Sequence, residues 1–437
     1  MAHSDKAAQA RISQDPRAAL ALQVIQELNK AGFLGYLAGG CVRDALLERT
    51  PKDYDVATNA RPEQIRDLFG RKRTLAIGAA FGVISVLPTT AGSAEPVEVA
   101  TFRSDGAYTD GRRPDSVHFS SPELDAHRRD FTINGMFLDP LRGEVIDFVG
   151  GRDDLAHGFI RAIGDPVARF TEDKLRLLRA ARFATTYNFA IEQQTMAAIV
   201  SHAADVMVCS GERIGAEMRR LISSPYAARG LMLLRESRLA EHLMPGVAAA
   251  WRDDVKFQYA QRLLSNLAPE FAVRLAGIGH SVGDNDAVGD NTFGESAGSV
   301  LKELGERWRL ANDELHAAQQ ALDFLPSLRR ASELPWSRLQ PLLIARYRDT
   351  AVELARGVLV ITGGEFTDAW KRIAAELSRS AEDLNPPPLL TGDDLIRMGM
   401  RPGPNFRELL AKLRDSQLDG EIATVAEAVE IARRNFT

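Results

Sequence analysis

Two acidic residues separated by a single position, Asp53 and Asp55, are the side chains best suited to phosphoryl-transfer chemistry. In a β-strand, residues i and i+2 project from the same face about 6.6 Å apart, so two carboxylates can share divalent cations. Two-metal sites hold ions roughly 3.5–4 Å apart, where they activate an attacking oxygen and bind a phosphate chain. Mg²⁺ suits this role because it uses few carboxylates and leaves positions for phosphate and water. Taken alone, the pair is equally compatible with a charged, solvent-facing strand.

Glycine and arginine residues upstream favour the phosphate-binding interpretation. Gly39 and Gly40 stand at an expected strand-to-helix junction, where backbone N–H groups can approach a phosphate and the helix start favours anions. Arg43, on the helix that follows, adds a forked donor for phosphate oxygens. Glu98 lies in a β-rich run and becomes a third carboxylate if that strand pairs beside the first two.

A second set of charged residues occurs at helical spacing. Asp173, Arg176 and Arg179 are expected on one face of a single helix, with Arg182 continuing the same face. Three arginines in one stripe repel one another unless something acidic lies there. The alternative is an exposed helix covered by salt bridges between its own residues.

The elements that position these residues follow from the hydrophobic pattern. Asp15 before Pro16 predicts a helix start, and Leu20, Val24 and Leu28 predict an amphipathic helix that ends near Gly32. Other helices are expected at 42–47 and 62–69, and strands at 33–38, 54–58, 83–87, 97–102 and near 145–148. The first 160 or so residues are therefore mixed α/β with a sheet of modest size.

From about residue 170, helical periodicity replaces the strand signals up to the C-terminal end. The expected class is α+β: an N-terminal head with a small mixed sheet and helices, followed by an all-α C-terminal half. Residues 279–298 are rich in Gly, Asn, Asp and Ser and predict a flexible loop, and the first 14 or so predict disorder. Thr391 with Asp394 and Thr424 with Glu427 predict capping boxes at C-terminal helices.

Composition excludes several classes of protein. The chain has 437 residues, a net charge of −5 and two cysteines, so it has neither a disulfide framework nor a cysteine-based zinc site. So few cysteines in a chain of this length favour the reducing cytoplasm. The N-terminus has no apolar signal-peptide core, and no apolar run is long enough to span a membrane. The acidic net charge argues only weakly against nucleic-acid binding, which needs a local basic patch.

Long blocks of the sequence resemble the class II tRNA nucleotidyltransferase and bacterial poly(A) polymerase family, of the DNA polymerase beta superfamily. The blocks are LAGGCVRDALLERTPKDYDVAT, RRDFTINGMFLDP, DFVGGRDDLAHGFIRAIGDP, RFTEDKLRLLRAARFA and SGERIGAEM, and they occur in the family's order. Together they cover roughly residues 16–245, and residues 389–422 resemble the family's C-terminal segment less specifically. The implied organisation is a catalytic head at 1–160, a nucleobase-recognising neck at 161–245, a helical body at 246–385 and a tRNA-binding tail at 386–437.

The resemblance implies roles for individual residues. Asp53 and Asp55 would bind Mg²⁺, and Gly39, Gly40 and Arg43 would lie at the triphosphate, while Arg129 and Asp130 would face the nucleotide and its ribose. Asp173 and Arg176 would hydrogen-bond the edge of the incoming base as a protein template, and Arg179 and Arg182 would serve phosphate or structure. The expected reaction is addition of CCA, or of the terminal A, to tRNA from CTP and ATP with release of pyrophosphate.

Three other functions remain open on the sequence. One is an enzyme that adds only A beside a separate CC-adding partner, and another is a poly(A) polymerase. The loop at 103–119 favours A addition, because family members that stop at CC have it shortened. A non-catalytic RNA-binding protein is disfavoured, because Asp53, Asp55 and Glu98 are all present. Some relatives carry an HD-type phosphohydrolase metal site, but the stretch 274–280 has no His-Asp pair, so none is expected here.

Overall fold

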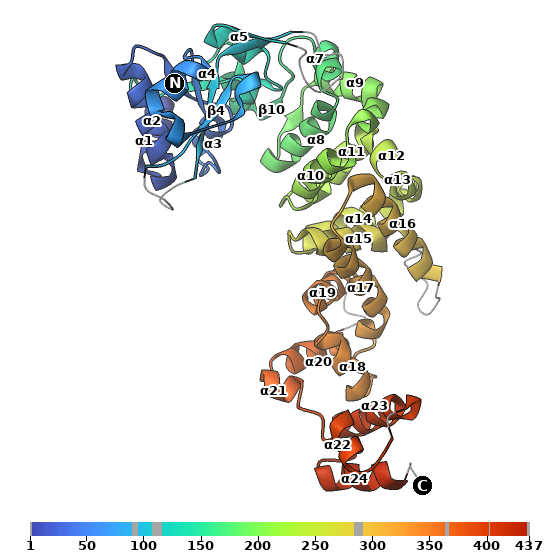
Figure 1. The fold of residues 1–437 in the computed structure, drawn as a ribbon. Coiled ribbons are helices and arrows are strands. Elements are labelled where there is room, and N and C mark those ends of the chain that lie inside the picture. Colours follow the sequence, from blue (N-terminus) through green and yellow to red (C-terminus); the bar gives the residue numbers. More distant parts are fainter. Residues whose placement is uncertain are drawn as a thin grey trace. The chain divides into compact units, whose positions relative to one another are not determined.

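The computed structural model divides into two compact units. Unit 1 comprises Met1–Leu221 and Arg229–Leu243, and unit 2 comprises Ile222–Ala228 and Met244–Thr437. Figure 1 follows the chain from the mixed α/β elements of unit 1 to the helices of unit 2. The structure describes residues 2–89, 95–106, 116–283, 292–362, 367–401 and 403–434.

A seven-stranded mixed sheet forms the centre of the head. The strand order is β3-β4-β5-β2-β1-β8-β9, in which β2 and β5 are parallel and the other neighbours are antiparallel. The bounds are β1 Gly35–Ala38, β2 Val56–Thr58, β3 Thr74–Gly78, β4 Val83–Val86, β5 Val97–Thr101, β8 Phe137–Asp139 and β9 Glu144–Ile146. The expected strands are confirmed, with shorter ends, and β3 and β8 are additional.

Helices and short turns complete the head. They are α1 Ala2–Gln14, α2 Ala19–Lys30, α3 Gly40–Leu46, α4 Pro62–Phe69, α5 Pro122–His127 and α6 Gly151–His157, with 3₁₀ turns η1 Pro16–Ala18, η2 Arg71–Arg73, η3 Ala79–Phe81 and η4 Thr132–Asn134. Two small ladders pair β6 Arg103–Asp105 with β7 Val117–Phe119, and β10 Phe159–Ile160 with β11 Ala190–Ile191. The predicted loop at 103–119 is thus a hairpin in its described part, and residues 107–115 lie outside the described residues.

The prediction of disorder at the N-terminus is wrong, because α1 packs on the head. Ala8 and Ile12 are almost fully buried. The Arg11 Nη1 group donates to the Ala45 carbonyl oxygen at 2.8 Å, and Arg152 Nη1 donates to Asp5 Oδ2 at 2.9 Å. Long-range contacts of this kind leave no signal in a stretch of small and polar residues.

A group of helices follows the sheet within unit 1. Their bounds are α7 Pro166–Glu172, α8 Leu175–Tyr187, α9 Gln193–His202, η5 Ala203–Val208, α10 Gly211–Ile222, α11 Ala227–Glu236 and α12 Leu239–Leu243. The single helix expected through 173–182 is in fact broken: α7 ends at Glu172, and Asp173 is extended with φ −141° and ψ 106°. The Asp173 carboxylate instead accepts a hydrogen bond from the Leu175 amide at the start of α8, at 3.1 Å.

Every regular element in the described residues of unit 2 beyond Met244 is a helix. The bounds are α13 Pro245–Ala250, α14 Asp254–Asn266, α15 Phe271–Val282, α16 Thr292–Trp308, α17 Asn312–Arg329, α18 Trp336–Leu343, α19 Arg348–Thr362, α20 Thr367–Leu377, α21 Ala381–Leu384, α22 Gly392–Arg397, α23 Pro404–Leu418 and α24 Val425–Arg434. The loop predicted at 279–298 is shorter than expected, since α15 and α16 extend into it; residues 284–291 lie outside the description. Both predicted capping boxes are confirmed.

None of the helices in the described ranges is long and apolar enough to cross a membrane.

Candidate active site

The turn between β1 and α3 has a backbone conformation that requires glycine. Gly39 has φ +70° and ψ −117°, and a Cβ atom there would lie 2.8 Å from Arg129 Nη1. Gly40 begins α3 directly after this turn. Gly39 is buried and Gly40 is half-buried, and the turn brings the Gly39 backbone close to the positive charge of the Arg129 guanidinium.

The acidic pair lies immediately before β2. Asp53 and Asp55 are exposed, whereas Tyr54 between them is buried and donates from its hydroxyl to Asp15 Oδ2 at 2.8 Å. The Ala38 amide donates to the Asp55 carbonyl oxygen at 3.0 Å, which continues the pairing of β1 with β2 by one residue. The alternation in burial directs both carboxylates to the same side of the extended segment.

Glu98 joins this pair through the parallel pairing of β2 with β5. Val56 is opposite Val99, so one step back along both strands brings Asp55 beside Glu98. The pKa of Asp55 is raised to about 6, first by desolvation and then by the charges of Asp53 and Glu98, against the opposing charge of Arg129. Because Asp55 keeps an exposed surface, water weakens the desolvation, and repulsion among carboxylates is the cause that the geometry supports most directly.

This donor set fits a hard divalent cation. The described residues supply no hydrogen bond or ion pair to the Asp53 and Asp55 carboxylates, so their mutual repulsion is not relieved by a protein cation in direct contact. Nowhere in the described ranges do three His, Cys, Asp or Glu side chains converge as a metal cage. Mg²⁺ does not need such a cage, because it accepts one or two carboxylates and completes its octahedron with water and phosphate oxygens.

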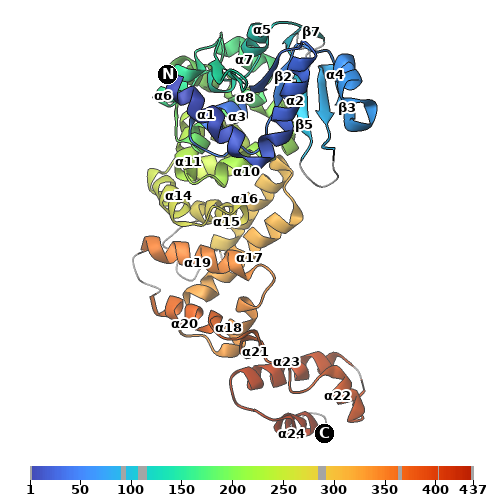
Figure 2. The same ribbon diagram turned by 90° about the vertical axis from the view of Figure 1, so that its left-hand side faces the viewer.

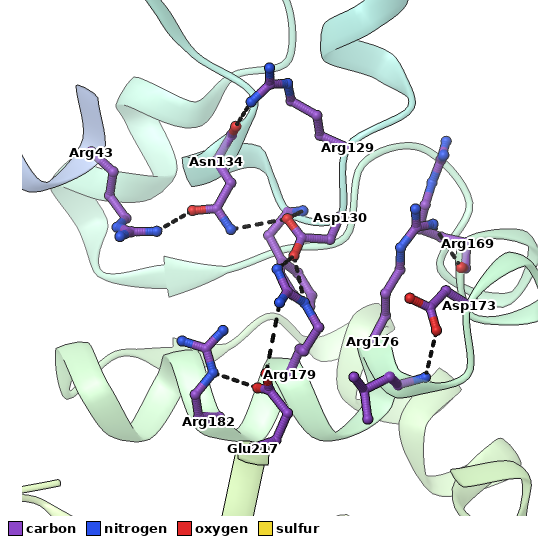
Figure 3. A network of polar contacts seen from close by, with 12 residues as sticks. Arg43, Arg129, Asp130, Asn134, Arg169, Asp173, Arg176, Arg179, Arg182 and Glu217 are labelled. Carbon is purple, nitrogen blue, oxygen red and sulfur yellow. Dashed lines mark hydrogen bonds and ion pairs between the residues drawn. The ribbon is translucent and has the colours of Figure 1, made fainter. Parts of the chain in front are cut away.

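Asp130 and Asn134 are the centre of a polar network that connects the sheet with α8 (Figure 3). Arg179 Nε donates to Asp130 Oδ2 at 3.0 Å, and Asn134 Nδ2 donates to Asp130 Oδ1 at 3.0 Å. The Asn134 Oδ1 atom in turn accepts a hydrogen bond from Arg43. Burial raises the pKa of Asp130, but Arg179 and Asn134 outweigh it, so its pKa lies well below the usual range.

Arg43 and Arg129 are both held in place by neighbours. Arg43 is buried, pairs with Asp44 at 2.9 Å and lies with its guanidinium carbon 4.6 Å from the centre of the Tyr187 ring. Arg129 pairs with Asp125 at 3.0 Å and donates to the Asn134 carbonyl oxygen at 3.2 Å. Asn134 thus contacts three of the residues expected at the nucleotide.

Each residue of the charged 172–182 segment has a partner. Arg213 Nη2 pairs with Asp173 at 2.9 Å, and Arg176 Nη1 pairs with Glu172 at 2.6 Å. Arg182 pairs with the buried Glu217 of α10 at 2.6 Å. Arg176 and Arg182 are buried, so the alternative of an exposed, self-paired helix is wrong. The acidic groups that the arginine stripe required are Asp130 and Glu217 (Figure 3).

The sequence interpretation did not assign roles to Asn134, Glu172, Arg213 and Glu217. Glu172 precedes Asp173, and Asn134 belongs to the same block as Asp130. Arg213 and Glu217 lie four residues apart in SGERIGAEM, a spacing that places both on one face of a helix. That spacing was the available signal, but only the fold shows which residues they face.

Comparisons with known proteins agree with this geometry. Residues 35–161 match the family model described as "Poly A polymerase head domain". Residues 188–250 match the family model described as "Probable RNA and SrmB- binding site of polymerase A". The CCA-adding enzyme of Levilactobacillus brevis is 32% identical over 418 residues, which cover 94% of this chain and 96% of that protein. The chain belongs to the CCA-adding enzyme family.

Other members of the CCA-adding enzyme family match over a similar length. The enzyme of Geobacillus stearothermophilus is 32% identical over 415 residues, covering 94% of this chain and 95% of the relative. A crystal structure of the Bacillus stearothermophilus CCA-adding enzyme in complex with CTP aligns with a TM-score of 0.75 and 28% identity, covering 97% of this chain and 98% of that one. A Thermotoga maritima CCA-adding enzyme complexed with tRNA aligns at a TM-score of 0.64 and 21% identity, covering 98% of each chain, and supports the fold alone. The predicted α+β class and nucleotidyltransferase identity are confirmed.

Proposed function

We propose that this protein adds CCA to the 3′ end of tRNA, with CTP and ATP as substrates and pyrophosphate as the second product. The observation that carries the proposal is the position of Asp53 and Asp55 directly before β2, with Glu98 in the adjacent row position of β5 and the Gly39 turn at the end of β1. Its full-length relatives are named CCA-adding enzymes, and a similar structure holds CTP. A cytoplasmic location and the four-part division into head, neck, body and tail belong to the same proposal.

The carboxylates give the site its chemistry. Mg²⁺ bound by Asp53 and Asp55 would lower the pKa of the tRNA 3′-hydroxyl and neutralise the triphosphate during in-line attack on the α-phosphorus. Glu98 adds negative charge that strengthens binding of a cation by the pair. The Gly39–Gly40 main chain and the Arg43 and Arg129 guanidinium groups serve the phosphates, and Asp130 serves the ribose hydroxyls.

Asp173 and Arg176 would select the base. A carboxylate accepts from an exocyclic amine, and a guanidinium donates to a neighbouring ring acceptor. Cytosine and adenine both present an amine beside such an acceptor, whereas uracil and guanine do not, so one residue pair can accept CTP and ATP. Arg213 orients Asp173 and Glu172 orients Arg176, which fixes both side chains at the break between α7 and α8.

Addition of the terminal A alone and poly(A) addition are the competing reactions of the same site. The hairpin of β6 and β7 lies in the segment whose length favours A addition, which supports use of ATP. A non-catalytic RNA-binding role is disfavoured, because Asp53, Asp55 and Glu98 are all present and lie in neighbouring positions of β2 and β5.

The decisive experiment supplies three purified tRNAs, which end at the discriminator base, at C and at CC, with labelled CTP or ATP and Mg²⁺. CCA addition predicts two C residues on the tRNA that ends at the discriminator base, one C on the tRNA that ends at C, and a single A on the tRNA that ends at CC. Incorporation of A only, and only after CC, would assign the protein to the A-adding enzymes, whereas repeated A addition would make it a poly(A) polymerase.

Variants connect that activity to the site. Asp53→Ala and Asp55→Ala should each reduce incorporation by at least about 10³-fold without loss of helical content. The control is Asp153→Ala, which removes an exposed carboxylate of α6 and should leave the rate unchanged. Asp173→Ala should raise incorporation of UTP and GTP relative to CTP and ATP. Substantial activity in both Asp53→Ala and Asp55→Ala would overturn the metal assignment.

A further inference from the structure

The outer strands of the head's sheet are in register with the carboxylates. Leu75 is opposite Ser85, Ser85 is opposite Glu98, and Glu98 lies beside Asp55. These four residues form one row across β3, β4, β5 and the start of β2. Because side chains in one row of a sheet point to the same face, β3 and β4 extend the face that carries the acidic residues.

The next row on that face ends in a positive residue. The Leu87 amide donates to the Arg73 carbonyl oxygen at 2.8 Å, so the β3–β4 ladder continues by one residue toward η2. If the β3–β4, β4–β5 and β2–β5 ladders all continue in this direction with unchanged register, Arg73 and Asp53 lie in the same row of the sheet. With strands about 4.8 Å apart, three spacings separate β3 from β2, which is about 14 Å.

Turn η2 concentrates uncompensated positive charge at this end of β3. Arg71 and Lys72 are exposed and Arg73 is half-buried. Among the described residues, none of the three is in an ion pair, whereas most arginines around the nucleotide site are paired. A local cluster of three cations in a chain of net charge −5 favours an anionic partner at this place.

The same edge exposes apolar side chains. Ile77 is 90% exposed and Leu75 is 41% exposed, both on β3, which is the last strand of the sheet (Figure 2). The register of β3 with β4 shifts between Leu75 and Gly78, an irregularity of the kind that protects sheet edges, yet Leu75 and Ile77 both remain exposed. Proteins bind single-stranded nucleic acids through cations at the phosphates and apolar, mostly aromatic, side chains at the bases; here Leu75 and Ile77 offer aliphatic contacts to sugars and bases beside the η2 cations.

The direction of in-line attack indicates that the partner at this surface is the RNA substrate. The groups proposed to hold the incoming nucleotide, Gly39, Arg129 and Asp130, lie on the β1 and β8 side of the carboxylates. In-line transfer places the attacking oxygen opposite the leaving pyrophosphate, so the RNA must arrive from the other side, across β5, β4 and β3. We infer that η2 and β3 form a platform that binds the RNA strand a few nucleotides before its 3′ end. This inference rests on the proposed function and names the surface that would position its RNA substrate.

The test measures the KM for a tRNA that ends in CC at saturating ATP, and the KM for ATP at saturating tRNA. The full-length double variant Arg71→Gln/Lys72→Gln should raise the KM for tRNA about three- to thirtyfold, with the KM for ATP changed less than about twofold. The slope of log KM for tRNA against log salt concentration should become shallower by about one to two. The double variant makes fewer contacts with phosphates, so tRNA binding releases fewer counterions.

The control is Lys30→Gln/Arg142→Gln, which removes the same charge from exposed positions away from η2 and β3. Lys30 ends α2, whose connection leads to Gly35, and Arg142 lies in the turn between β8 and β9. Both side chains are exposed. An equal rise in the KM for tRNA in both double variants would show that the effect comes from the net charge of the protein. That outcome would overturn the proposal that η2 and β3 bind the RNA strand.

A second pair of variants tests the apolar part of the surface. Ile77→Glu places a negative charge on the platform and should raise the KM for tRNA, whereas Leu141→Glu in the β8–β9 turn should not. Because Ile77 is exposed, its substitution does not disturb the core. If wild type adds nucleotides but neither platform variant changes the KM for tRNA, the platform is wrong and the proposed function stands. If wild type adds nothing to any tRNA, the proposed function itself fails.

Discussion

At the scale of single residues, Asp55 illustrates the conflict between stability and chemistry. Its pKa of about 6 in the fold lies above the ordinary value of 3.8, so the folded state binds the proton more tightly than the unfolded chain does. The corresponding stabilisation is complete below about pH 3.8 and is lost as the pH rises through 6. Without a cation, ionisation of Asp55 therefore weakens the fold at neutral pH, and a bound Mg²⁺ would reverse this.

Thermal denaturation with and without Mg²⁺ checks this expectation. In EDTA at pH 7.5, Asp55→Asn should have a Tm at least as high as wild type, although we expect the variant to be inactive. Mg²⁺ should raise the Tm of wild type more at pH 7.5 than at pH 5, and should not raise that of Asp55→Asn. The control Asp153→Asn should behave like wild type in every condition. A wild-type protein that is more stable than Asp55→Asn in EDTA at pH 7.5 would show that the carboxylate is not strained.

The sequence predicts the placement of individual side chains well where the signal is local. Asp53 and Asp55 are two positions apart, and period-two alternation alone places them on one side of an extended segment. The role of Glu98 depended on a strand register that no local pattern encodes. Asn134 could not be singled out, because its importance comes from contacts with Arg43, Arg129 and Asp130, which come from three different places in the chain.

At the scale of secondary-structure elements, local rules predicted helix starts better than helix continuity. Pro62–Phe69 was predicted to the residue, since Pro62 marks the first turn and Gly70 ends the helix. The break at Asp173 was missed because the arginine spacing from 176 to 182 suggested one continuous helix. Aspartate competes for backbone amides, and here it accepts from the Leu175 amide instead of continuing α7.

The pairing of α8 with α10 depends on Glu217. Its carboxylate is buried and pairs with Arg182 at 2.6 Å and with Arg179 at 3.8 Å. Removing one member of a buried ion pair leaves the other charge uncompensated, which typically costs 3–5 kcal/mol. Glu217→Gln should therefore destabilise unit 1 by about 3 kcal/mol, seen as faster hydrogen exchange of the α8 and α10 amides.

The control for Glu217→Gln is Glu241→Gln, because Glu241 and its partner Arg238 are both exposed. An exposed pair contributes about 0–1 kcal/mol, so exchange in α8 and α10 should be unchanged in this variant. If both substitutions changed hydrogen exchange in α8 and α10 equally, the buried pair would contribute no more to stability than the exposed pair does. The double variant Glu217→Leu/Arg182→Leu should recover part of the lost stability, since it removes both buried charges.

At the scale of the whole molecule, each of the two units has stabilising contacts of its own. The polar network of Figure 3 belongs to unit 1, where it joins residues far apart in sequence. In unit 2, the last helices α22, α23 and α24 have a small core of their own, formed by Leu390, Leu395, Leu409, Leu413, Ile422, Ala428 and Ala432. Asp419 links this core to α18 by accepting hydrogen bonds from the Ser337 amide and hydroxyl at 2.8 and 2.7 Å.

A separate core makes the C-terminal segment removable. Deleting residues 389–437 should leave the KM for ATP within about twofold of wild type, because the proposed nucleotide residues all lie in unit 1. If the segment binds tRNA, the same deletion should raise the KM for tRNA by about tenfold or more and make the salt dependence shallower, since several phosphate contacts are lost. The control is Ser337→Ala, which weakens the link to Asp419 but keeps the segment. An unchanged KM for tRNA after the deletion would assign tRNA affinity to the remaining helices of unit 2 and to the head, whereas a changed KM for ATP would mean that the nucleotide site depends on this distant segment.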